Sequence, residues 1–320
     1  VIPIAKMKDF GFIRVAAATP LVNLADPARN AAGTCSQIDE AEKAGVALII
    51  FPELGMTGYT CVDLFTQRAL RAGAEEAVAT VAEFTRDRLI TAVVGAPVLF
   101  CGLLYNCGIV IRGGRIRGIV PKIHLPNTSE FYEARWFTSG SEIGTGDIVD
   151  YAGTEDCPIS SYLLFNLGQT TFGLELCEDL WTPIPPSTYH CMMGAHIIAN
   201  LSASNETVGK QAFMKALVEQ QSSRCRCAYI YSSCGWGEST QDTVFGGGAL
   251  IYEDGTLLAE GERFLDRPQM VIRDVDTETL SISRLKSHTF NSTAPDGTPS
   301  GSYRSRYKWV GLGNPPGNDS

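Results

Sequence analysis

TFGLELCEDLW, residues 171–181, combines an apolar run with a cysteine and an acidic pair. The bulky residues of the run favour a strand, and Gly173 permits close approach of another backbone. The acidic pair ends the run, and three prolines among residues 183–186 predict no regular structure directly after it. A cysteine at a strand end, followed by free backbone amides, can act as a nucleophile beside an oxyanion site. The alternative is that Cys177 is a small buried hydrophobe, as most free cysteines are.

Two other apolar runs also end in a polar residue capable of chemistry. VALIIFPE (46–53) ends in Glu53, and IRGIVPK (116–122) ends in Lys122, each preceded by a proline that closes the strand. Side chains at strand ends can meet at one edge of a sheet, where sites are commonly built. We therefore expect both residues to lie near Cys177. Taken singly, Glu53 could be a capping carboxylate and Lys122 a surface lysine.

The three residue types suit nucleophilic catalysis. A thiol with a pKa near 8.5 is mostly protonated at neutral pH and needs a base or a nearby cation. Glu53 in an apolar pocket would have the raised pKa that a general base requires. Lys122 would stabilise a thiolate and the oxyanion of a tetrahedral intermediate. A Cys–His pair that uses His124 is the competing arrangement, but no Asn or Asp partner for this histidine is evident.

The order of predicted elements indicates an α/β fold with mixed sheets and helices packed outside. Helices are predicted over residues 27–44, 64–89 and 207–226, and hairpins over 106–122 (turning at Gly113-Gly114), 161–177 and 246–262. Further strands are predicted over residues 12–20, 46–53, 91–100, 195–202, 228–234 and 270–276. Residues 123–158 carry few regular signals, and so long a loop is usually functional. Beyond about residue 285 the Ser, Pro and Gly content predicts a loosely ordered tail.

Composition excludes several classes of function. The chain has 320 residues, 44% of them hydrophobic, and a net charge of −9, which argues against nucleic-acid binding. The sequence has ten cysteines without a CxxC pair and only four histidines, so it lacks the ligand spacing that is typical of a zinc site. The sequence has no apolar run of eighteen residues and no signal-peptide pattern, so no membrane association is expected. We predict a reduced, cytoplasmic protein.

The ordered set Glu53, Lys122 and Cys177 resembles the nitrilase, or carbon–nitrogen hydrolase, superfamily over roughly residues 12–285. Within it the chain looks most like the N-terminal glutaminase domain of bacterial glutamine-dependent NAD synthetases. This narrower resemblance rests on four long motifs: FPELGMTGYT (51–60), PKIHLPNTSEFYEARWF (121–137), CEDLWTPIPPS (177–187) and NLSASNETVGK (200–210).

The resemblance implies a four-layer α-β-β-α sandwich that forms a homo-oligomer. It makes Glu53 the general base, Lys122 the cation at the tetrahedral intermediate and Cys177 the nucleophile, with the backbone N–H of Glu178 in the oxyanion hole. It also makes Glu133 a second carboxylate beside the lysine, for which the alternative is a surface ion pair with Arg135.

The resemblance further assigns Tyr59, Phe131, Ser204 and Lys210 to a glutamine pocket. Lys210 stands where an arginine can occur, so a compact ammonium group replaces a guanidinium that could bind a carboxylate through two hydrogen bonds. Thr128 stands where many relatives have a tyrosine that touches the substrate.

The implied reaction is hydrolysis of glutamine to glutamate and ammonia through a γ-glutamyl thioester, without a metal or organic cofactor. The implied partner is an ATP- and Mg-dependent pyrophosphatase domain that amidates nicotinic acid adenine dinucleotide to NAD. Its SGGxDS-type loop is absent from this sequence. Residues 1–285 would form the glutaminase domain and residues 286–320 an extended tail or linker toward the synthetase domain. The alternatives are a stand-alone amidase for another small amide and a non-catalytic binding subunit.

Overall fold

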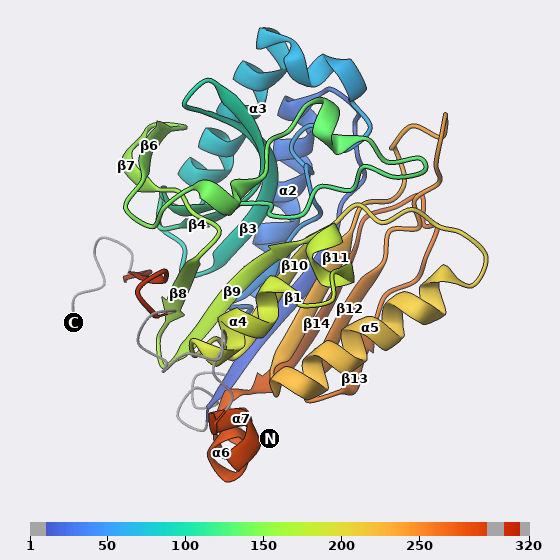
Figure 1. Cartoon of the computed structure of the whole chain (residues 1–320). Helices are drawn as coiled ribbons and strands as arrows, with labels where there is room; N and C mark the ends of the chain where they lie inside the picture. Colours follow the sequence, from blue (N-terminus) through green and yellow to red (C-terminus); the bar gives the residue numbers. More distant parts are fainter. Residues whose placement is uncertain (1–10, 293–303, 314–320) are drawn as a thin grey trace.

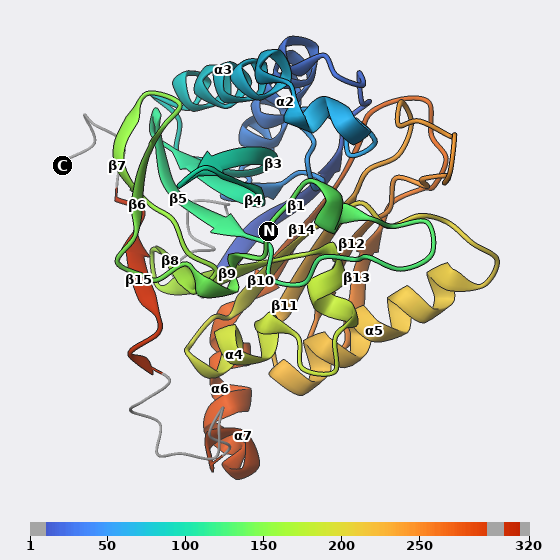
Figure 2. The ribbon, with the colours of Figure 1, turned by 45° about the horizontal axis from the view of Figure 1, so that its top comes forward.

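The computed structural model describes residues 11–292 and 304–313. Two β-sheets pack face to face, and a pair of helices covers the outer face of each, as the ribbon shows from two directions (Figures 1 and 2). This is the expected four-layer α-β-β-α sandwich. A small two-stranded sheet, β6 (Ile148–Tyr151) and β7 (Thr154–Pro158), lies at the side.

The first sheet carries two of the predicted strand ends. Its six strands run in the order β14-β1-β2-β3-β4-β5. Parallel pairing joins β1 to β2 and β2 to β3, whereas β14, β4 and β5 pair antiparallel to their neighbours. Their bounds are β1 Phe12–Thr19, β2 Leu48–Ile50, β3 Thr91–Phe100, β4 Leu103–Arg112, β5 Arg115–Pro121 and β14 Gln269–Asp276.

The second sheet carries the third strand end. Its seven strands run in the order β13-β12-β11-β10-β9-β8-β15, with β9, β10 and β11 parallel at its centre. Their bounds are β8 Leu163–Leu167, β9 Thr170–Leu176, β10 Ile197–Ser202, β11 Ala228–Ser233, β12 Ala249–Glu253, β13 Thr256–Glu260 and β15 Lys308–Gly311.

Three apolar layers hold the sandwich together. Helices α2 (Pro27–Lys43) and α3 (Arg68–Phe84) pack on the first sheet through residues such as Ile38 and Val78. The two sheets meet in a core that contains Phe165 and Phe172, whose rings stack with centroids 5.2 Å apart. Helices α4 (Pro186–Met192) and α5 (Lys210–Cys225) cover the second sheet.

Three expectations about regular structure are wrong. Residues 123–158 contain two short 3-10 helices, η3 (Glu133–Arg135) and η4 (Gly140–Glu142), as well as the β6–β7 sheet. The prolines at 183–186 do not prevent a helix, because α4 begins at Pro186, and proline is favoured in the first turn.

The third wrong expectation concerns the tail. Helices α6 (Thr277–Lys286) and α7 (His288–Ser292) cross the predicted boundary, and β15 pairs in parallel with β8. The prediction of a loosely ordered tail is therefore wrong for these stretches. The remainder of the tail, residues 293–303 and 314–320, lies outside the described residues. Within the described residues, none of the helices is long and apolar enough to cross a bilayer.

Candidate active site

Lys122 lies at the centre of a buried cluster of charged side chains. Its Nζ donates hydrogen bonds to Glu53 Oε1 at 2.6 Å and to Glu133 Oε1 at 2.7 Å. The lysine and Glu53 side chains are fully buried, and Glu133 is 2% exposed. Burial lowers the pKa of Lys122, but Glu133 and Glu53 offset this, so that the net pKa lies well above its usual value. The lysine is therefore a fixed positive charge at neutral pH, and it is not a surface residue.

Glu53 stands on a tight turn that follows β2. The backbone of this turn is held between the sheets, because the Glu53 N–H donates to Ser202 O and the Met56 N–H donates to Gly95 O. Its Oε1 accepts hydrogen bonds from Lys122 and from Asn106 Nδ2, the latter at 2.6 Å. Its Oε2 is buried and has no hydrogen-bond partner among the described residues. One carboxylate oxygen is thus anchored while the other remains available to accept a proton.

The pKa of Glu53 is raised to about 7. Burial is the main cause, and the neighbouring Glu133 adds to it, while Lys122 and Asn106 oppose it. A carboxylate with this pKa is ionised in about half of the molecules near neutral pH, which is suitable for a general base.

Cys177 follows β9 and opens a 3-10 helix, η5 (Cys177–Trp181). Its backbone φ of 43° lies in the left-handed region, which is strained for a residue with a side chain. The residue is 5% exposed, and burial and then Glu53 raise the pKa of its thiol, against smaller opposing effects of Lys122 and the backbone of Ala203. The resting thiol is therefore protonated, and the cation beside it does not create a thiolate without a base.

Asp179 fixes the turn that carries Cys177. Its carboxylate accepts hydrogen bonds from the Leu176 N–H at 3.0 Å and from the His124 N–H at 2.8 Å. This buried side chain joins the cysteine turn to the loop after Lys122, and burial raises its pKa to about 7. His124 is an exposed residue, and its backbone N–H, not its imidazole, bonds to Asp179. The competing Cys–His arrangement therefore finds no support.

A pocket of about 250 Å³ opens over Glu133. Tyr59 lines it and donates from its hydroxyl to Glu133 Oε1 at 2.7 Å, and Phe131 packs edge-on against the Tyr59 ring. Glu133 pairs with Lys122 as the resemblance implied, and its alternative partner Arg135 pairs with Asp63 at 2.7 Å.

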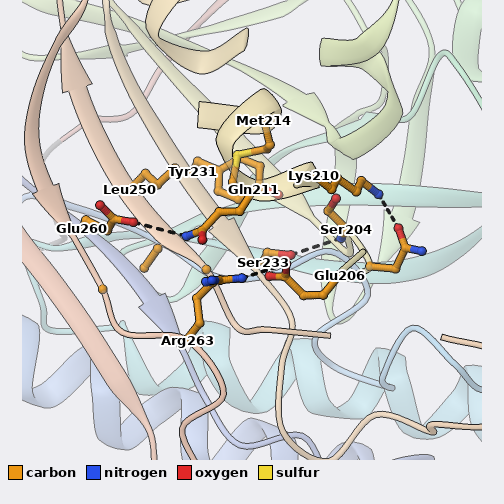
Figure 3. A pocket seen from close by; sticks show the side chains of 14 residues that line it. Ser204, Glu206, Lys210, Gln211, Met214, Tyr231, Ser233, Leu250, Glu260 and Arg263 are labelled. Carbon is orange, nitrogen blue, oxygen red and sulfur yellow. Dashed lines mark hydrogen bonds and ion pairs between the residues drawn. The ribbon is translucent and has the colours of Figure 1, made fainter. Parts of the chain in front are cut away.

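Ser204 and Lys210 line a second, smaller pocket between α5 and the edge of the second sheet (Figure 3). The Lys210 ammonium stands over the rings of Phe131 and Trp181, 5.6 and 5.2 Å from their centroids. It also acts electrostatically on the half-buried Glu178, the residue after the cysteine. The structure thus divides the predicted pocket residues between two adjoining pockets, with Tyr59 and Phe131 in one and Ser204 and Lys210 in the other. Thr128 is exposed on the loop before Phe131.

Three residues that shape the site were not predicted from the sequence. Asn106 binds Glu53, Asp179 anchors the cysteine turn, and the buried Glu238 accepts hydrogen bonds from the backbone of Tyr59 and Thr60. A polar residue within the apolar run 106–111 was an available signal for Asn106. No sequence signal marked Glu238, because it stands in a loop far along the chain from the other site residues.

Comparisons with known proteins group the chain with one family. The profile of the carbon–nitrogen hydrolase family matches residues 14–282. The chain is 38% identical over 288 residues to the glutamine-dependent NAD(+) synthetase of Mycobacterium leprae and 39% identical over 285 residues to that of Mycobacterium tuberculosis. Each alignment covers 88% of this chain and 41% of the relative, so the chain spans about two fifths of the length of these curated relatives.

Solved structures give the same grouping. A glutamine-dependent NAD(+) synthetase from Cytophaga hutchinsonii superposes with a TM-score of 0.75 and 29% identity, over 83% of this chain and 43% of the other. A carbon–nitrogen hydrolase from Helicobacter pylori has a TM-score of 0.72 over 90% of this chain and 97% of the other; at 17% identity it supports the fold alone.

Proposed function

Because this chain belongs to the carbon–nitrogen hydrolase family, whose profile covers residues 14–282, we propose that it hydrolyses the side-chain amide of glutamine with Cys177 as the nucleophile. The observation that carries the proposal is the buried ammonium of Lys122, bonded to Glu53 and Glu133 at 2.6 and 2.7 Å and in electrostatic contact with the Cys177 thiol. We propose glutamine as the substrate because relatives at 38% and 39% identity are named glutamine-dependent NAD(+) synthetases.

The reaction begins when Glu53 takes the thiol proton as Cys177 Sγ attacks the amide carbonyl carbon. The Oε2 atom of Glu53, which has no hydrogen-bond partner among the described residues, is available to accept this proton. Lys122 and the backbone N–H of Glu178 would stabilise the oxyanion, since the first N–H groups of a helix such as η5 have no intrahelical partner. Glu53 then returns the proton to the departing nitrogen. Ammonia leaves, and a γ-glutamyl thioester remains.

The second half of the reaction restores the thiol. Water gives a proton to Glu53 as it attacks the thioester carbonyl, and the proton passes to the departing sulfur, which yields glutamate. No step requires a metal or an organic cofactor. Tyr59 and Phe131 would line the substrate's path, and Ser204 and Lys210 would bind its carboxylate.

We further propose that the ammonia supplies an ATP- and Mg-dependent domain that amidates nicotinic acid adenine dinucleotide to NAD. The support is the alignment with two fifths of each curated relative. The homo-oligomer and the cytoplasmic location stay predictions of the sequence analysis.

The test combines covalent labelling with ammonia release. Diazo-oxo-norleucine, a reactive glutamine analogue, should label Cys177 in the full-length protein, as located by peptide mass spectrometry. Cys177→Ser should abolish both labelling and glutamine hydrolysis. The exposed Cys101 is the matched control, because Cys101→Ser should change neither.

Two results would contradict the proposal. Labelling at another residue, or none in the intact protein, would remove Cys177 as the nucleophile. Faster ammonia release from amides that are not amino acids than from glutamine would favour the stand-alone amidase.

A further inference from the structure

A bridge of three polar side chains joins the two pockets of the site. Asn205 donates from Nδ2 to Glu130 Oε1 and accepts at Oδ1 from Lys210 Nζ. The dashed line from Lys210 in Figure 3 marks the second of these bonds. Asn205 is 5% exposed, so its amide is held between the two charged groups away from solvent. The amide orientation is fixed by charge, because its donor faces the anion and its acceptor faces the cation.

Both ends of the bridge border the catalytic cluster. Glu130 lines the pocket that has Glu133 in its wall, and none of the described residues lining that pocket is a lysine or an arginine. Lys210 lines the other pocket with Ser204 and acts electrostatically on Glu178, beside Cys177. A substrate held between the two pockets would therefore meet an anion at Glu130 and a cation at Lys210.

The charges on the two sides match an α-amino acid. Its ammonium and carboxylate stand on one carbon atom, and Glu130 and Lys210 stand one amide group apart. Each retains capacity for a further bond, because a carboxylate has a second oxygen and an ammonium has three donors. No ion pair is formed by Glu130 within residues 11–292 and 304–313.

We propose that Glu130 binds the α-ammonium group of the substrate and that Asn205 is a positioning residue that holds Glu130 opposite Lys210. The inference rests on the proposed glutaminase function and extends it: the site selects the zwitterionic head group of a free amino acid amide. Besides Glu130 and Glu133, the pocket is lined by the carboxylate of Asp242, which accepts a hydrogen bond from the Tyr132 hydroxyl at 3.0 Å and is the rival candidate.

The test compares three substrates in the full-length protein. Glutamine carries both charges, 4-carbamoylbutanoate lacks the ammonium group, and 4-aminobutanamide lacks the carboxylate. Glu130→Gln should lower kcat/KM for glutamine and for 4-aminobutanamide by about 10- to 100-fold, the usual value of a hydrogen bond to a charged group. It should leave kcat/KM for 4-carbamoylbutanoate within about twofold, because that substrate has no ammonium group to lose. Asp242→Asn should leave all three values nearly unchanged.

Asn205→Ala tests the positioning role. It should raise KM for glutamine more than it lowers kcat, and Glu130→Asp should recover part of the preference for glutamine over 4-carbamoylbutanoate. Equal losses on all three substrates in Glu130→Gln, or a glutamine-specific loss in Asp242→Asn instead, would overturn the inference while the glutaminase function stands. If the unmodified protein prefers either analogue to glutamine, the proposed function fails and this inference fails with it.

Discussion

Lys122 forms ion pairs with two buried carboxylates, so its contribution to stability can be measured separately from its contribution to activity. Lys122→Met would leave Glu53 and Glu133 buried without a counter-charge. Breaking a buried pair by removing one partner usually costs roughly 3–5 kcal/mol, so we expect a loss of that order in the free energy of unfolding. Urea denaturation followed by circular dichroism measures it.

A double variant provides the control. Lys122→Met combined with Glu133→Gln removes one of the two stranded charges and should recover a large part of the lost stability. Glutamine hydrolysis should stay abolished, because the oxyanion has lost its cation. Recovery of activity in the double variant would show that Lys122 serves stability alone.

The pKa of Glu53 predicts how activity depends on pH. A carboxyl whose pKa is raised to about 7 is protonated below that pH and cannot accept the thiol proton. The value of kcat/KM for glutamine should therefore rise with pH and level off above an apparent pKa near 7. The Asn106 hydrogen bond lowers the pKa of Glu53, so Asn106→Ala should move the midpoint to higher pH.

The exposed Asn127 supplies the comparison for this experiment. Asn127→Ala changes an asparagine on the loop after Lys122, outside hydrogen-bond contact with Glu53, and should leave the midpoint in place. A pH profile of kcat/KM that is flat from pH 6 to 8 would contradict Glu53 as the base.

At the residue scale, the sequence predicted the residues that stand at strand ends or within long motifs. Glu53, Lys122 and Cys177 each interrupt an apolar run, which is a local signal. The ion-pair partner of Glu133 could not be chosen from the local sequence, because Lys122 and Arg135 both lie close to it along the chain. It was decided by the fold, which turns Arg135 outward to Asp63.

At the scale of elements, strand β3 supports the turn that carries Glu53. A Cβ atom on Gly95 would stand 2.3 Å from Leu54 N and 2.6 Å from Pro52 O. These are backbone atoms, so they cannot rotate away. Gly95→Ala should therefore displace the Glu53 turn, lower the melting temperature and sharply reduce kcat for glutamine, as thermal unfolding and steady-state assays would measure.

Gly33 is the matched control for this substitution. It lies inside helix α2, and a Cβ there would meet nothing within 4 Å. Gly33→Ala should preserve activity and stabilise the protein by about 0.5–1 kcal/mol, since alanine is the better helix former. If Gly95→Ala behaves like Gly33→Ala, the strand does not position the base.

Helices and strands were predicted well where their local sequence pattern was strong. Strands such as β1 and β3 are mostly apolar, and α2 has a capping aspartate and a first-turn proline, so their positions were predicted closely. Helix α4 was missed because its prolines were interpreted as breakers, although Pro186 occupies the favoured first turn. Strand β15 was missed because its pairing with β8 is fixed by tertiary contacts; its side chains Trp309 and Val310 are only partly buried.

At the scale of the whole molecule, the proposed catalytic groups come from different sheets. Glu53 and Lys122 follow β2 and β5 of the first sheet, and Cys177 follows β9 of the second. Their approach depends on how closely the sheets pack across the central core. The spacing between sheets is set by side chains from many strands, so the convergence could be expected from the strand ends but its geometry could not be derived.

This dependence can be tested away from the site. A Cβ atom on Gly118 of β5 would stand 2.8 and 2.9 Å from ring atoms of Phe165, which belongs to the opposite sheet. Gly118→Ala should press the sheets apart near Lys122. Overpacking of a core typically costs about 1–3 kcal/mol, so we expect a destabilisation of that order together with a fall in kcat for glutamine.

A second substitution separates spacing from backbone effects. Gly146 lies on a loop with nothing within 4 Å of an added Cβ, so Gly146→Ala should leave stability and kcat unchanged. Gly118→Ala combined with Phe165→Leu removes the ring that the new methyl group meets. If sheet spacing controls the approach of Cys177 to Glu53, this double variant should recover kcat relative to Gly118→Ala. A double variant with kcat no higher than that of Gly118→Ala would show that the two sheets position their catalytic groups independently.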